Sequence, residues 1–300
     1  MPSTRNTTPQ NHRRPRRHRA HPMTERFADL HLHTTFSDGT DTPRQLVELV
    51  HQTGISTMAI TDHDNTDAIA IAEPIAKQLG VELIRGIEMS ASIEDIEVHL
   101  LGFLMDISYA GLQAHLATQQ QRRVQRVHQM IKQLQQVGVN ISAEEVLQLA
   151  GEGTVGRPHV ARTLLKHGYV SATAEAFTKY LSPGKPGFVS GSQHTPEYII
   201  KVIREAGGVP VLAHPVYLRK DALIEQFVSQ GLAGLEVYHS GHPPDLVQHY
   251  ERIADRLRLL KTGGSDYHGN AKEGAPVGSV KVSYQLVEGL RAWKASHASR

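Results

Sequence analysis

Residues 27–34 read FADLHLHT, an apolar β-type segment that runs into two histidines separated by one residue. Side chains alternate along a strand, so Asp29, His31 and His33 are expected on one face. Further clusters of His, Asp and Glu each follow an apolar β-type run: TDHD (61–64), GIE (86–88) with EVH (97–99), AHP (213–215) and GSDYH (264–268). Polar residues gathered at strand ends are how an α/β barrel or sheet builds its active site, so the pattern predicts an α/β fold.

Length and composition set limits on the architecture and on the chemistry. At 300 residues the chain can form one large α/β domain with an insertion, or two smaller domains. It contains no cysteine, which excludes disulfides, thiolate zinc sites and cysteine nucleophiles. Any metal must therefore be held by imidazoles and carboxylates, which suit Mn, Fe or Zn. No apolar run approaches the roughly 20 residues of a membrane-spanning helix, so we expect a cytoplasmic protein.

The N-terminal segment differs in charge from the rest of the chain. Its first 22 residues carry six Arg and no acidic residue, whereas the remainder has 26 basic and 30 acidic residues, a net charge of −4. The segment has no apolar h-region and is not a secretory signal. We expect residues 1–25 to be a disordered basic tail, with Met23 as an alternative start. A basic arm that contacts RNA or another polyanion is the other interpretation.

The alternation of β- and α-type patterns divides the chain into three parts. Residues 27–104 read β-α-β-α-β-β, strand patterns vanish in 108–195, and alternation resumes after Thr195 to give about seven strands. Short connections favour parallel neighbours and right-handed crossovers. We therefore expect a distorted seven-stranded (β/α) barrel built from residues 26–107 and 196–300, with 108–195 as an inserted helical cap beside the strand ends.

Local signals place some helix ends. Thr42 as N-cap and Pro43 at the first helical position open a helix that Gly54 can end. Pro74 lies inside the second helical pattern, TDAIAIAEPIAKQL, so that helix either kinks at Pro74 or begins later.

Taken singly, each polar cluster also has an ordinary structural explanation. Asp38 before Gly39 belongs to a tight loop that can turn its carboxylate toward the histidines, but an Asx-turn would look the same. In TDHD, the residues around His63 are good helix caps, and capping is the simpler interpretation of that motif alone. His99 by itself would be a core histidine.

Taken together, the clusters favour a metal site. So many carboxylates and imidazoles converging without cations would bury an unbalanced polar cluster, which is costly. In this interpretation Glu88 bridges two cations. The predicted ligands are His31, His33, Asp38, His63, Glu88, His99, His214, Asp266 and His268.

The order of these motifs from residue 27 to residue 268 resembles the PHP (polymerase and histidinol phosphatase) family of metal-dependent phosphoesterases. The resemblance implies a distorted seven-stranded barrel with two or three divalent metal ions, with Mn expected and Fe or Zn as alternatives. When the family's ligands are carried over by position, the resemblance implies three sets. One ion would be bound by His31, His33, Glu88 and Asp266, and a second by Asp38, His63 and His214. A third would be bound by Glu88, His99 and His268.

This ligand set implies hydrolysis by a metal-bound hydroxide, because cations depress the pKa of bound water. No catalytic side chain is then required as nucleophile. A general acid is unnecessary if a metal binds the leaving oxygen; His239 and His242 are the alternatives, with His242 expected at the surface.

The insertion carries candidate phosphate-binding residues. GRPH supplies Arg157 and His159 near a helix start, and RRVQR supplies Arg122, Arg123 and Arg126 on a long helix. A solvated helix face is the alternative explanation of the latter. A helical insertion with GRPH resembles the subgroup that acts on nucleoside 3′,5′-bisphosphates and 5′-phosphorylated RNA ends, in which arginines hold the phosphate that does not react.

The sequence therefore predicts a phosphoesterase acting on a nucleotide or a short 5′-phosphorylated RNA, in the manner of a 5′-3′ exonuclease. The 5% aromatic content and the acidic body favour a short substrate over a long nucleic acid. The alternatives are a small-metabolite phosphatase of the histidinol-phosphate type and a non-catalytic RNA-binding module. No membrane association and no obligate protein partner are expected.

Overall fold

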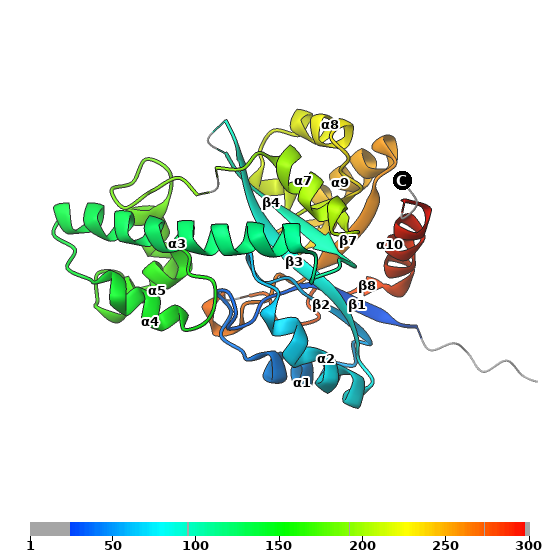
Figure 1. Ribbon diagram of the computed structural model, residues 1–300, viewed down its shortest axis with the longest axis horizontal. Coiled ribbons are helices and arrows are strands. Elements are labelled where there is room, and N and C mark those ends of the chain that lie inside the picture. Colours follow the sequence, from blue (N-terminus) through cyan, green and yellow to red (C-terminus); the bar gives the residue numbers. More distant parts are fainter. Residues whose placement is uncertain (1–24, 95, 192, 273, 298–300) are drawn as a thin grey trace, which may run out of the picture.

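The computed structural model describes residues 25–94, 96–191, 193–272 and 274–297 (Figure 1). The expectations for the basic N-terminal tail fall almost entirely on residues 1–24, outside these ranges. Within them, no helix is both long and apolar enough to cross a membrane.

A single sheet of eight strands forms the centre of the protein, in the order β7-β6-β5-β4-β3-β2-β1-β8. The β1-β2-β3 and β5-β6-β7 pairings are parallel, whereas β4 runs antiparallel to both β3 and β5. The strands are β1 (Phe27–Leu32), β2 (Thr57–Ile60), β3 (Glu82–Ile93), β4 (Ile96–Phe103), β5 (Val209–Leu212), β6 (Gly234–His239), β7 (Leu260–Gly264) and β8 (Val282–Ser283).

The sheet curves until its two ends nearly meet. Just after β7, the N–H of Asp266 donates to the carbonyl of His31 in β1 at 2.9 Å, and the N–H of Ser265 donates to Asp29 Oδ1 at 2.9 Å. The predicted α/β barrel is thereby confirmed, but the expected number of seven strands is one too few. The additional strand, β8, has only two residues and pairs antiparallel with β1, so it is too short to leave a pattern in the sequence.

Six helices belong to the barrel: α1 (Pro43–Gln52), α2 (Asp67–Leu79), α7 (Pro196–Glu205), α8 (Ala222–Ser229), α9 (Pro244–Leu257) and α10 (Tyr284–His297). Thr42 caps α1 as predicted, in a reciprocal capping box with Gln45. Pro74 lies within α2, which begins at Asp67, so the alternative of a later start was wrong.

The inserted helices form a cap with a hydrophobic core of its own. They are α3 (Ala110–Gln136), α4 (Ala143–Ala150), α5 (Arg157–Lys166), α6 (Thr173–Ala176) and a π-helical turn, η1 (Phe177–Leu181). The second half of α3 contributes Met130 and Leu134 to the cap core, whereas Leu112 and Leu116 in its first half pack into the barrel core. Figure 1 shows α3 as the long helix that spans both parts. One rigid element therefore fixes where the cap stands over the barrel.

Candidate metal centre

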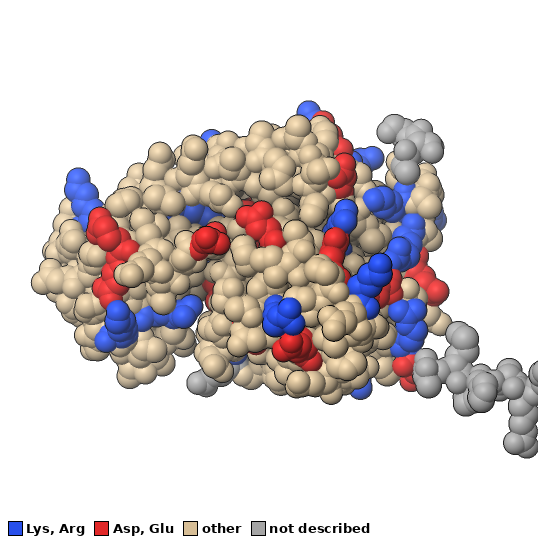
Figure 2. Space-filling model, turned by 60° about the horizontal axis from the view of Figure 1, so that its bottom comes forward, with Lys and Arg blue, Asp and Glu red and all other residues tan. Residues whose placement is uncertain are grey.

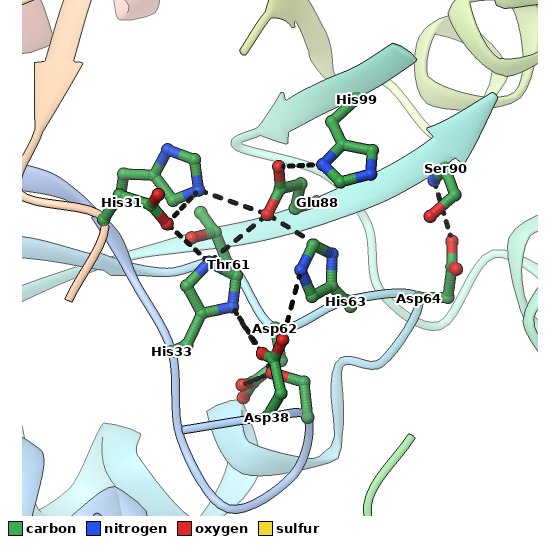
Figure 3. Close-up of polar contacts among 12 residues, drawn as sticks. His31, His33, Asp38, Thr61, Asp62, His63, Asp64, Glu88, Ser90 and His99 are labelled. Carbon is green, nitrogen blue, oxygen red and sulfur yellow. Dashed lines mark hydrogen bonds and ion pairs between the residues drawn. The ribbon is translucent and has the colours of Figure 1, made fainter. Parts of the chain in front are cut away.

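The structure brings all nine predicted ligand side chains together at one end of the barrel. His31 lies in β1, Glu88 in β3 and His99 in β4, while the others lie in segments that follow β1, β2, β5 and β7. Four overlapping groups of three or four of these side chains have ligand atoms within 4.8 Å of one another. Figure 3 shows His31, His33, His63 and His99 directed toward Glu88.

Glu88 is the central carboxylate of this cluster and is 1% exposed. Its two oxygens face different imidazoles (Figure 3). Oε1 lies 2.8 Å from both His99 Nδ1 and His214 Nε2, and Oε2 lies 3.2 Å from His31 Nε2, 3.2 Å from His33 Nε2 and 3.3 Å from His63 Nδ1. A carboxylate placed in this way can bridge two cations, one through each oxygen.

A second carboxylate, Asp38, stands on the other side of His33 and His63. Its Oδ1 lies 3.3 Å from His268 Nε2, and its Oδ2 lies 3.7 Å from His63 Nε2. Asp38 is held there by Asp62, which accepts hydrogen bonds from Thr34 and from the Ser37 hydroxyl in the loop before it. The capping interpretation of TDHD was therefore wrong, because the N-cap of α2 is Thr66 and Asp62 supports a loop.

The side-chain contacts group the candidate ligands differently from the three groups that the family resemblance implied. His214 faces Glu88 together with His99, and His268 faces Asp38 together with His63. The two histidines thus exchange the places expected for them. Strand order is the reason: His214 follows β5, the neighbour of β4, whereas His268 follows β7, where the barrel closes onto β1 and the Thr40 N–H donates to the His268 carbonyl.

Several buried polar atoms of the cluster have no hydrogen-bond partner within the described part of the chain and could serve as ligands for cations. His33 Nε2, Asp38 Oδ1 and His63 Nδ1 are buried, and although the imidazole or carboxylate atoms named above lie 3.2–3.3 Å from them, none has a partner in hydrogen-bonding geometry among the described residues. Buried polar atoms in proteins are otherwise almost always satisfied. Imidazole and carboxylate are also the ligands of Mn, Fe and Zn. The residues present therefore fit divalent cations.

Burial and mutual repulsion set the protonation of the ligands. Burial lowers the pKa of His63 to about 3, which leaves it in the neutral form that binds metal. Burial also disfavours a charge on His99, yet the Glu88 carboxylate raises the pKa of that imidazole to about 10. In return, although burial opposes its charge, the imidazoles of His63 and His99 hold the pKa of Glu88 well below its usual range. Protons on such imidazoles balance the carboxylates, and cations that bind there would displace them.

Two supporting residues lie behind the ligands. The buried Glu236 lies 2.9 Å from His31 Nδ1 through Oε1 and accepts the His214 N–H through Oε2 at 2.7 Å. Carboxylates in this position orient ligating imidazoles. Glu236 was not among the residues predicted from the sequence, although an acidic residue in the buried strand GLEVYH was the available signal. Lys272, also missed, forms an ion pair with Asp266.

Of the two alternative general acids, His239 and His242, only His239 contacts a candidate ligand in the structure. His239 Nε2 lies 3.2 Å from Asp266 Oδ2, so it borders the ligand cluster. His242 was expected at the surface, and this was wrong: the side chain is buried and its Nδ1 lies 2.8 Å from the Val237 carbonyl.

Backbone strain accompanies two of the ligands. His214 has a φ of 25° and Asp266 a φ of 54°, both in the left-handed region that residues with a Cβ rarely adopt. Such conformations persist only where the surroundings impose them, and they cluster at functional sites. Here they turn the side chains that follow β5 and β7 back over the barrel end.

A cavity of about 250 Å³ opens on the Glu88 side of the cluster. Arg157 and Tyr217 line it together with His99, His214 and His268. Arg157 forms an ion pair with Glu97, which also lines the cavity. The cavity therefore contains a guanidinium within the same space as the ligand histidines.

The other predicted substrate-binding residues do not line this cavity and contact other parts of the protein. Arg126 donates through Nε to the Val189 carbonyl, its Nη2 is buried without a partner among the described residues, and burial lowers the pKa of its guanidinium to about 10. Arg123 binds Asp64, and Arg122 lies 2.7 Å from His194 Nε2. His159 is buried and accepts the Gly156 N–H through Nδ1, at the start of its own helix.

Gly264 is required where β7 meets β1. A Cβ at this position would overlap the backbone N of His31 and lie 2.9 Å from Asp29 Oδ1. We expect Gly264→Ala to lower the free energy of unfolding by about 1–3 kcal/mol through overpacking, measured by urea denaturation. Gly289→Ala in α10 is the matched control, because its Cβ would meet only Leu260 Cδ2, at 3.7 Å. That control is expected to be neutral or to gain up to about 1 kcal/mol; equal effects would contradict the close approach.

Comparison with known proteins gives a consistent set of matches. The model of the PHP domain family matches residues 29–182. The 5′-3′ exoribonuclease Rnm of Escherichia coli is 37% identical over 247 residues, covering 80% of this chain and 84% of the relative. The 3′,5′-nucleoside bisphosphate phosphatase of Chromobacterium violaceum is 33% identical over 259 residues, covering 84% and 91%. A solved structure from Bifidobacterium adolescentis, provisionally described as a metal-dependent phosphoesterase, is 33% identical with a TM-score of 0.83, covering 91% of this chain and 97% of that one.

Proposed function

The chain belongs to the PHP domain family, and from this premise we propose that it is a metal-dependent phosphoesterase that hydrolyses nucleoside 3′,5′-bisphosphates and short 5′-phosphorylated RNA. The observation that carries the proposal is the position of Glu88, whose two oxygens face separate groups of imidazoles beside a cavity that contains Arg157. The relatives named above act on nucleotide or RNA substrates, which supports the same class of substrate here.

Bound divalent cations would supply a water of lowered pKa and would neutralise charge on the phosphoryl group. We propose three groups of protein ligands for them, with Mn first and Fe or Zn as alternatives. His31, His33, Glu88 and Asp266 form one group; Glu88, His99 and His214 the second; Asp38, His63 and His268 the third. Glu236 keeps His31 and His214 in orientation, and Lys272 limits the negative charge on Asp266.

Arg157 and Arg126 are proposed to bind the phosphate that does not react. Arg157 lines the cavity, and Arg126 lies near the same Glu97 carboxylate, with one guanidinium nitrogen unpartnered. Guanidinium groups bind phosphate oxygens in a bidentate manner. A 5′-phosphate in the cavity would therefore place the 3′-phosphate of the same nucleotide over the ligand histidines.

A short substrate fits the surface of the protein better than a long one. Figure 2 shows basic and acidic side chains interspersed over the face that it draws, with no continuous basic track there among the described residues. Continuous basic grooves are what proteins use to follow a nucleic-acid backbone. The cytoplasmic location expected from the sequence stays a prediction.

Comparison of substrates, with and without metal, tests this function. We expect Mn²⁺-dependent hydrolysis of adenosine 3′,5′-bisphosphate and of a 5′-phosphorylated RNA trinucleotide, and loss of activity after chelation that Mn²⁺ reverses. Adenosine 3′-monophosphate lacks the 5′-phosphate and should show a kcat/KM lower by about 10- to 100-fold, the worth of one or two charge-assisted hydrogen bonds.

The control substrate is histidinol phosphate, which carries a single phosphate. Preference for it over the bisphosphate would overturn the substrate assignment while leaving the metal chemistry intact. Absence of metal-dependent turnover on every substrate would contradict the proposed function and favour a binding role.

A further inference from the structure

A second cavity, of about 180 Å³, lies beside the ligand cluster under the cap, and the Phe177 ring that lines it has its centroid 5.9 Å from Arg157 Cζ. Asp38 and His268 line it where it meets the proposed metal ligands, and the cap supplies Pro158, Arg162 and Phe177. His268 also lines the first cavity, so the two cavities share a wall. The candidate ligand cluster thus borders two pockets.

Arg162 is the distinctive residue of this second pocket. It is half-buried in α5, and no hydrogen bond or ion pair of its guanidinium is found among the described residues. The nearby cation Lys272 is already paired with Asp266, and Asp38 faces His63 and His268. An arginine partly withdrawn from water without a partner is expected to bind an anion.

The size and walls of the pocket limit what it can hold. Cavities for whole drug-sized ligands measure about 300–1,000 Å³, so about 180 Å³ suits one sugar–phosphate unit better than a complete nucleotide. Phe177 and Pro158 supply apolar surface for a ribose, and Arg162 supplies the charge. Arg162 also lines an adjoining cavity that Glu152 borders, and this carboxylate would repel a further phosphate. The pocket therefore has room for a single unit.

We infer that the Arg162 pocket binds the nucleotide that follows the scissile phosphate of an RNA substrate, through its ribose and its 3′-phosphate. This inference rests on the proposed function.

In both substrates water adds across the same P–O3′ bond: its oxygen joins phosphorus and a proton goes to the 3′-oxygen. The bisphosphate yields a nucleoside 5′-monophosphate and inorganic phosphate. RNA yields the same monophosphate and a shortened RNA with a 5′-phosphate. Only RNA has a nucleotide beyond the reacting phosphate, so Arg162 serves RNA alone.

Substitution of Arg162 separates the two activities. For Arg162→Gln we expect kcat/KM on a 5′-phosphorylated RNA trinucleotide to fall about 10- to 100-fold, as for loss of a hydrogen-bonded ion pair, with adenosine 3′,5′-bisphosphate hydrolysed at the wild-type rate. Lys166→Gln on the same helix, whose side chain is exposed and paired with Glu145, is the matched control and should change neither rate. The bisphosphate rate also reports that the variant is folded.

The outcomes are distinct. An equal fall on both substrates, or an unchanged RNA rate, would overturn the Arg162 pocket. Hydrolysis of the bisphosphate but not of RNA by the wild-type protein would overturn it too. Failure of the wild-type protein on both substrates would instead contradict the proposed function.

Discussion

Glu88→Gln is expected to lower kcat/KM for the bisphosphate by at least about 10³-fold, because each 1.4 kcal/mol is tenfold and a metal site contributes several kcal/mol. The amide retains the shape of the carboxylate but has no charge, and only one of its two terminal atoms is an acceptor. Two cations that share Glu88 would therefore lose their common ligand. The measurements are hydrolysis at saturating Mn²⁺ and metal content after dialysis.

Glu225→Gln is the matched control for this change. Glu225 lies exposed on α8, paired with Arg256, and its replacement should leave both activity and metal content unaltered. Thermal unfolding of both variants would show whether either substitution disrupts the fold. A Glu88→Gln protein with full metal content and activity within tenfold of wild type would refute the bridging role of this carboxylate.

Arg123→Ala is expected to lower the free energy of unfolding by about 3–5 kcal/mol, the range for removing one partner of a buried ion pair. The Arg123 guanidinium donates to Asp64 Oδ2 at 2.9 and 2.6 Å, and also to the Ser90 hydroxyl. Asp64 is fully buried after β2, whereas Arg123 belongs to α3. The substitution would leave the Asp64 charge buried beside little more than the Ser90 N–H. Urea denaturation measures the loss.

Removing the stranded charge should reverse most of this effect. In the double variant Asp64→Asn with Arg123→Ala, the neutral amide can remain in the left-handed conformation of residue 64, where φ is 46°. Arg252→Ala, on the exposed face of α9, is the control and should change stability by no more than about 0.5 kcal/mol. A double variant as unstable as Arg123→Ala would show that the pair is not the cause.

The gathering of the candidate ligand side chains could be predicted from the sequence because their signals are local. The alternation of His31 and His33 in a strand, and of Asp266 and His268 after another, identifies the barrel end at which they gather. Which ligand faces which depends on strand order and on barrel closure, and neither is a local property. For that reason His214 and His268 were assigned to each other's places.

Residues that act through packing were harder to predict. Arg122, Arg123 and Arg126 look alike within RRVQR, yet the crossing of α3 over the barrel gives them three different environments. Arg162, three residues beyond His159, was not considered because the GRPH motif ends before it. Helix spacing shows which side chains share a face but not what stands opposite that face.

The closure of β7 onto β1 has a consequence for protein synthesis. The proposed ligands His31 and His33, in β1 and directly after it, are synthesised early, whereas Asp266 and His268 follow only after β7. Domains generally fold as units during synthesis, so the barrel can close only after β7 has been made. A nascent chain that has not yet reached β7 thus lacks part of the proposed ligand set, and under the proposed function it could not hold the full set of cations. Metal content would therefore distinguish molecules that extend past β7 from shorter fragments in a cell extract.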